Sequence, residues 1–214
     1  MVHECGHFLS AKVCGIETKQ ITLYPLGGIS KMEIDMNENP FIEGFIIIMG
    51  PLFQVIAYCI LIYLFPDKEI IKRIHYGILS FNLLPIYPLD GGRFLNLFMN
   101  IILPYKKSFY ISIMISYCMT IIILFNQIKL SINIFIIYIV LMSMIHKEEL
   151  KSNLYFQKFL LERYLKKYRF HKDRIITHIE NMYRYQNNVI KEENRYISEK
   201  DYLIQKYEKI DKKC

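Results

Sequence analysis

Long uninterrupted runs of apolar residues dominate the hydrophobic pattern of this chain. Three of them, Phe45–Phe65, Tyr110–Phe125 and Leu130–Ile145, contain no Lys, Arg, Asp or Glu. A helix needs about 20 apolar residues to cross the hydrocarbon core of a bilayer, so the first run is long enough and the other two need flanking residues. The alternative is a set of buried helices in a soluble protein, which the lack of charge over such lengths disfavours. We therefore expect membrane-spanning helices.

Local signals place the ends of the expected helices. Asn39 is a suitable cap for the first long helix, and Pro51 is expected to kink or unwind it. Gln54, the sole amide in that apolar run, is expected to hydrogen-bond a neighbouring segment. A helix over residues 1–14, ended by Gly15, is too short to span a bilayer.

Alternating apolar and polar residues predict a β-hairpin between the first two helices. Residues 19–24 and 29–34 alternate, and the sequence Pro-Leu-Gly-Gly between them is typical of a turn. An exposed edge of this hairpin could pair with an extended peptide. A purely structural hairpin at the membrane surface explains the pattern equally well.

The last part of the chain is polar and basic. Residues 146–214 contain 17 Lys and Arg against 11 Asp and Glu, which accounts for +6 of the total charge of +7. A basic segment directly after a membrane helix favours the cytoplasmic side and can contact anionic lipid. Interleaved acidic residues and the lack of a binding motif disfavour nucleic acid. The patterns predict helices over Leu154–Tyr168 and Asp173–Tyr185, a strand pair within 188–197 and a final helix capped by Ser198.

Composition supports the same class of protein. The 214 residues are 53% hydrophobic, and the mean hydropathy is +0.19, which is too apolar for an ordinary soluble domain. Five cysteines without a C-x-x-C pair indicate no disulfide framework. We predict an all-α polytopic membrane protein with a small β-hairpin near the membrane surface and a short, cytoplasmic, mainly helical tail. The expected boundary separates a membrane core, 1–145, from the tail, 146–214.

The opening residues carry the first candidate for chemistry. His3 and His7 belong to an H-E-x-x-H pattern, and on a helix they share one face. Two imidazoles and a third ligand form a zinc site with an open position for water. Glu4 stands beside the first histidine, where its carboxylate could take a proton from that water. The alternative is a helix start with two histidines that are satisfied by hydrogen bonds.

A second polar cluster supplies the third ligand. Residues 82–93 read N-L-L-P-I-Y-P-L-D-G-G-R, and two prolines with two glycines argue against a regular helix there. Asp90, flanked by apolar segments, requires a cationic partner, which is either a metal ion or Arg93. Periodicity does not choose between them. Because the two-histidine site lacks a third ligand, we predict that Asp90 binds the metal.

Three features together resemble the site-two protease family of intramembrane zinc metalloproteases. These are H-E-C-G-H, the turn P-L-G-G, and Asn-x-x-Pro-x-x-Pro-x-Asp-Gly within residues 82–93. Within the family, the compact core and basic tail resemble the stage-four sporulation branch, which cleaves the pro-sequence of a late mother-cell sigma factor. The resemblance covers 1–145 well. It implies that the zinc ligands are His3, His7 and Asp90. It further implies that Glu4 is the catalytic base and that Asn82 and Pro88 are loop residues near the substrate.

The resemblance also implies an enzyme and its partners. It predicts a multi-pass zinc metalloendopeptidase that cleaves a membrane-associated pro-protein of the pro-sigma-factor type. Further partners are membrane lipid and regulatory membrane proteins, without direct nucleic-acid binding, and the tail, 146–214, is expected to be a reduced CBS-like segment. Family members carry a membrane helix before the zinc-bearing helix. We therefore expect an N-terminally truncated chain, which begins inside a longer gene product or at a start codon assigned too late.

Two rival interpretations remain. Another class of H-E-x-x-H membrane proteases uses a downstream Glu as the third ligand, but the apolar runs contain no Glu-rich motif of that kind. The other rival is an inactive truncated copy that acts only as a membrane binding partner. The intact Glu4 argues against long decay, whereas the missing front segment argues for it.

Overall fold

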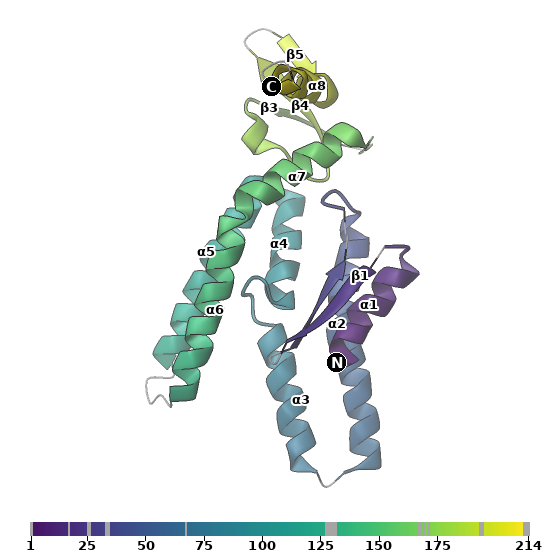
Figure 1. The fold of residues 1–214 in the computed structure, drawn as a ribbon, viewed down its shortest axis with the longest axis vertical. Helices are drawn as coiled ribbons and strands as arrows, with labels where there is room; N and C mark the ends of the chain where they lie inside the picture. The colour runs from purple at the N-terminus through teal and green to yellow at the C-terminus, as the bar shows by residue number, and fades with distance from the viewer. Residues whose placement is uncertain are drawn as a thin grey trace. The chain divides into compact units, whose positions relative to one another are not determined.

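The chain packs into two compact units in the computed structural model (Figure 1). The first comprises Met1–Ile34 and Glu38–Leu95, and the second comprises Asp35–Asn37 and Asn96–Cys214. The structure describes residues 2–16, 18–24, 27–32, 35–66, 68–126, 132–166, 168, 170, 172–192 and 195–211.

The first unit opens with a short helix and a hairpin. Helix α1 covers Val2–Val13 and ends before Gly15, whose φ of +75° suits a residue without a side chain. Strands β1 (Thr18–Tyr24) and β2 (Gly27–Met32) pair antiparallel, which confirms the predicted hairpin. The two glycines of the expected turn lie at the start of β2, while the preceding Pro and Leu fall outside the described residues.

Helix α2 (Pro40–Leu64) packs closely against α1 in this unit. Its start is as predicted, because the side chain of Asn39 accepts a hydrogen bond from Phe41 N at 2.9 Å. A side chain at Gly6 of α1 would collide with Met49 of α2, so glycine allows the two helices to approach. The helix continues through Pro51 and is followed by α3 (Glu69–Asn82).

Within the described residues, two helices are long and apolar enough to cross a membrane. They are α2, over Pro40–Leu64, and α5 (Tyr105–Asn126), over Tyr105–Phe125. Only 17% and 33% of their most apolar stretches are buried within the protein, which is low for core helices of a soluble domain. Helix α6 (Ile132–Leu150), which contains much of the third apolar run, packs against α5. Among the described residues it does not meet the same criterion of length and hydropathy.

Helix α4 (Asp90–Ile102) begins earlier than the sequence indicated. The expectation of irregular backbone through residue 93 was wrong, because Gly91 and Gly92 are helical. A side chain on Gly91 would collide with the carbonyl of Leu83, and one on Gly92 with the backbone of Ile86. The glycines therefore let the preceding loop fold back onto the first turn of α4, and that turn begins with Asp90.

The tail of the second unit mixes helices with a small sheet. It contains α7 (Ser152–Leu165), β3 (Asp173–Ile176), the 3₁₀ turn η1 (Ile179–Asn181), β4 (Asn187–Glu192), β5 (Arg195–Ser198) and α8 (Glu199–Asp211). Strand β3 pairs parallel to β4, and β4 pairs antiparallel to β5. The predicted strand pair is confirmed, and so is the cap of the last helix, where Ser198 Oγ accepts from Asp201 N at 3.2 Å. The predicted helix over 173–185 was wrong, because β3 and η1 lie in this stretch.

Pairing between strands explains the error at β3. The apolar residues Ile175, Ile176, Ile179 and Met182 have helix-like spacing, but Ile175 and Ile176 lie opposite Val189 and Ile190 of β4. The tail core includes Ile176 and Ile190 of this sheet, so tertiary packing overrides the local pattern. Its buried members are Tyr105, Phe156, Phe159, Leu160, Ile176, Met182, Ile190 and Leu203.

The tail also holds a short piece of the chain from between β2 and α2. This linker is Asp35–Asn37, which belongs to the second unit. Glu162 of α7 accepts a hydrogen bond from Met36 N at 2.6 Å, and Arg163 Nε donates to Asn37 Oδ1 at 2.7 Å. The linker is therefore bound through backbone and side-chain groups alike.

Arg163 is the centre of this polar network. It is 7% exposed and forms an ion pair with Glu199 at 3.0 Å. Burial lowers the pKa of the Arg163 guanidinium, and the Glu199 carboxylate opposes that shift. Arg184 donates to the carbonyl of Met36, and Lys166 pairs with Asp35 at 2.5 Å.

Candidate metal centre

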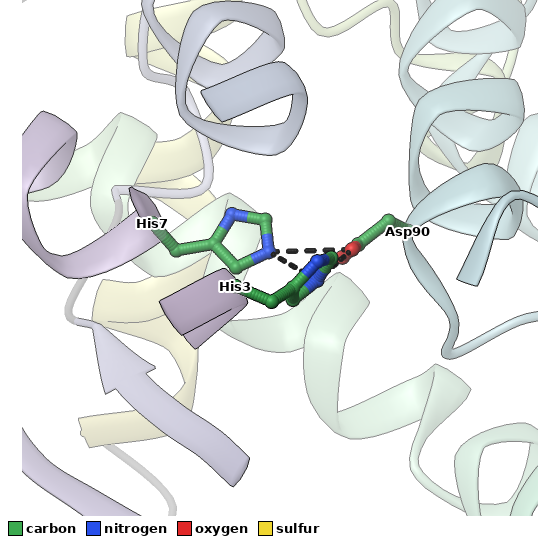
Figure 2. Close-up of side chains that lie close together, drawn as sticks. All are labelled: His3, His7 and Asp90. Carbon is green, nitrogen blue, oxygen red and sulfur yellow. Dashed lines mark hydrogen bonds and ion pairs between the residues drawn. The ribbon is translucent and has the colours of Figure 1, made fainter. Parts of the chain in front are cut away.

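Three predicted ligands converge on one point in the first unit. His3 and His7 come from one face of α1, and Asp90 comes from the first turn of α4 (Figure 2). Asp90 Oδ2 lies 2.8 Å from His3 Nε2 and 3.2 Å from His7 Nε2, and the two Nε2 atoms are 3.2 Å apart. All three residues are buried. The fold thus brings together groups that are up to 87 positions apart in sequence.

The outer nitrogens of both histidines also have partners. His7 Nδ1 lies 2.8 Å from the carbonyl oxygen of Ile46, and His3 Nδ1 lies 3.1 Å from Gln54 Oε1. Both oxygens can only accept a hydrogen bond, so each Nδ1 carries the hydrogen. In the neutral rings, both Nε2 atoms then present a lone pair toward Asp90. Metal-bound histidines commonly have outer partners of this kind.

This arrangement fits a zinc ion. Two imidazole lone pairs and one carboxylate face one another, and three acceptors repel unless a cation lies among them. Zinc takes His nitrogen and carboxylate oxygen in tetrahedral geometry, in which ligand atoms lie roughly 3.3 Å apart. Two of the three separations here are 3.2 Å. Three protein ligands leave the fourth position open, as in catalytic zinc sites.

Glu4 and Arg93 flank the three ligands. Glu4 is half-buried on α1 and lies close enough to interact electrostatically with both histidines and Asp90. Arg93 also interacts electrostatically with Asp90, but among the described residues His3 and His7 make the hydrogen bonds to its carboxylate. The site contains a carboxylate outside the ligand set and a nearby positive charge. No downstream Glu takes the third position in the part of the chain that the structure describes.

Asn82 and Pro88 lie on the segment that precedes Asp90. Asn82 is the last residue of α3, and Pro88 follows a cis peptide bond in the loop before α4. Both are half-buried, and neither makes a hydrogen bond to the ligand set among the described contacts. Their role toward a substrate stays a prediction.

Gly50 is a residue of the site that the sequence did not single out for this purpose. It lies on α2, and a Cβ there would collide with the imidazole of His7. The α2 backbone cannot retreat freely, since its Ile46 carbonyl accepts from the same imidazole. Glycine therefore lets α2 approach the metal centre and hold His7.

Substitution of Gly50 by Ala is expected to weaken zinc binding. Overpacking of a tight contact costs about 1–3 kcal/mol, and here the imidazole must shift to relieve it. Chelator competition in detergent would measure the loss. Gly77→Ala on α3 is the matched control, because nothing lies within 4 Å of a Cβ at that position. Equal affinities in the two variants would contradict the proposed contact.

The family comparison agrees with the geometry. A model of peptidase family M50 matches residues 1–78, which include α1, the hairpin and α2. Over these residues the chain is similar to peptidase family M50. The M50 match contains His3, Glu4 and His7, while Asp90 lies beyond it and is brought to the site by the fold.

Individual relatives extend the M50 similarity along the chain. Stage IV sporulation protein FB of Bacillus subtilis is 30% identical over 181 residues, which are 79% of this chain and 62% of that protein. Zinc metalloprotease MJ0392 of Methanocaldococcus jannaschii is 30% identical over 149 residues, which are 65% of this chain and 43% of that protein. This chain therefore spans less than two thirds of the length of either relative.

A solved structure supports the fold. The site-2 protease from Methanocaldococcus jannaschii matches with a TM-score of 0.58 at 26% identity, over 69% of this chain and 72% of that one. Together with the M50 match, this confirms the predicted resemblance to the site-two protease family.

Proposed function

We propose that this protein is an intramembrane zinc metalloprotease. The observation that carries the proposal is the convergence of His3, His7 and Asp90, with the Glu4 carboxylate beside them but outside the ligand set. The M50 match and the names of two relatives, a zinc metalloprotease and a putative zinc metalloprotease of Synechocystis, support the same activity. The long apolar helices α2 and α5 support a membrane location.

The residues have distinct roles in the proposed reaction. Zinc held by the three ligands would polarise the substrate carbonyl and make a bound water acidic. Glu4 accepts a proton from the attacking water as the new C–O bond forms. It then gives that proton to the amine nitrogen as the peptide C–N bond breaks. Burial of the site protects these charges from bulk water and strengthens their interactions.

The substrate must reach the site in an extended form. A peptide carbonyl within a helix is occupied by its own hydrogen bond, so a helical segment has to unwind before attack. In our proposal, the hairpin β1–β2 or the segment from Asn82 to Pro88 holds the unwound strand. Main-chain pairing at a strand edge is a common way to bind such a peptide.

We further propose a membrane-associated pro-protein as the substrate, of the pro-sigma-factor type. Similarity to a stage IV sporulation protein supports this choice. The basic tail would lie on the cytoplasmic side, where anionic lipid and regulatory membrane proteins are the expected partners.

Metal removal in a defined cleavage assay tests the activity. The purified chain in detergent or vesicles should cleave a membrane-tethered pro-protein of this type. Treatment with a zinc chelator should abolish cleavage, and added zinc should restore it. The control is the same pro-protein without its membrane segment, which should resist cleavage. Cleavage that continues with full metal removal would contradict the proposal.

A further inference from the structure

Gln54 connects three helices at the edge of the metal centre. It lies on α2 within an apolar run and is only 9% exposed. Its Nε2 donates to the carbonyl oxygen of His75 on α3 at 3.1 Å, and its Oε1 faces His3 Nδ1 on α1 at 3.1 Å. A polar side chain in such an apolar helix is costly unless both of its ends are satisfied, as they are here.

The contact with α3 determines which way the Gln54 amide points. The backbone carbonyl of His75 can only accept a hydrogen bond, so the amide must turn its NH₂ group toward it. The amide oxygen is then left to face His3 Nδ1. Since that oxygen can only accept, His3 must carry its proton on Nδ1 and keep Nε2 free for the metal side.

The two histidines differ in how their rings are held. The partner of His7 Nδ1 is a backbone oxygen, that of Ile46, which any residue at position 46 would supply. The partner of His3 is a side chain, so its chemistry can be changed by substitution. His3 also makes the shorter contact to Asp90, at 2.8 Å. A substitution at position 54 can therefore change the hydrogen bond that holds the His3 ring, whereas one at position 46 leaves the bond to His7 in place.

We propose that Gln54 is a positioning residue of the metal centre. It selects the tautomer of His3 that leaves Nε2 unprotonated, and it fixes the plane of that ring. This inference rests on the proposed binding of zinc by His3, His7 and Asp90. Outer hydrogen-bond partners of metal ligands typically change metal affinity by about 10- to 100-fold when they are removed.

Two substitutions of similar size separate the roles of the amide. Gln54→Met removes both hydrogen bonds and keeps the length of the side chain. Gln54→Glu keeps an oxygen for His3 Nδ1 but loses the donor to His75. The full chain in detergent would be titrated with zinc against a chelator of known affinity. Thr120→Val is a matched control, because it deletes a buried hydrogen bond to the carbonyl of Ser116 on α5, which belongs to the second unit.

We expect Gln54→Met to weaken zinc binding by about 10- to 100-fold, while Gln54→Glu and Thr120→Val keep the affinity of the natural chain. Thermal unfolding of the metal-free variants shows whether each one is folded. Unchanged zinc affinity in a folded Gln54→Met protein would overturn the inference. Equal losses of affinity in the Met and Glu variants would also overturn it, because they would indicate a role in packing alone. If the natural chain itself binds no zinc, the proposed function fails instead.

Discussion

Replacing Glu4 with Gln is expected to stop peptide hydrolysis while the chain still binds zinc. The carboxylate of Glu4 lies beside the three ligand atoms but is not one of them, so zinc affinity should be retained. An amide of the same shape cannot accept a proton. Loss of a general base typically lowers the rate by about 10²- to 10⁴-fold. Cleavage of a membrane-tethered substrate and zinc content would be measured on the same preparation.

The matched control for this substitution is Glu69→Gln. Glu69 is an exposed residue in the first turn of α3, and it should be replaceable without effect on cleavage. Undiminished cleavage by the Glu4 variant would refute its role as the base. Loss of zinc together with activity would place Glu4 among the metal ligands.

Substitution of Asp90 is expected to remove both zinc and activity. Asp90 is the sole carboxylate in the described ligand set, and it contacts both histidines. Without it, two neutral imidazoles remain as ligands. Zinc affinity should therefore fall by more than the roughly 100-fold that removal of an outer hydrogen-bond partner can cause. Asp90→Ala also shortens the side chain that begins α4, so Asp90→Asn, which keeps that shape, should be made beside it.

The zinc content of the two Asp90 variants should be compared. Both should lose zinc, as measured by metal analysis after purification, while the Asn variant keeps the shape of the helix start. Asp201→Asn is the matched control, because Asp201 lies in the first turn of α8 in the tail. Full zinc occupancy in both Asp90 variants would exclude Asp90 as the third ligand and would favour a protease class with a different one.

The convergence of the candidate ligands could be predicted because their chemistry leaves few choices. His3 and His7 are fixed on one helical face by their spacing of four. Asp90 is a single carboxylate between apolar segments, so its need for a cation is visible without coordinates. The helix start at Asn39 and the stop before Gly15 follow from local backbone rules, and the structure shows both.

Contacts between distant segments could not be predicted in the same way. Gly91 and Gly92 looked like helix breakers, and only the folded loop at Leu83 and Ile86 shows why they must be glycines inside α4. The apolar spacing in 173–185 suited a helix until β4 paired with it. Gln54 was expected to bind a neighbouring segment, but nothing in the sequence named its two partners on α1 and α3.

The linker Asp35–Asn37 affects how the tail can be prepared for separate study. A recombinant piece limited to 146–214 would lack Asn37 and the Met36 carbonyl, which accept hydrogen bonds from Arg163 and Arg184. Each guanidinium would lose one acceptor, and a buried donor left without that partner costs stability. Grafting the three linker residues onto such a fragment through a flexible spacer would restore those acceptors.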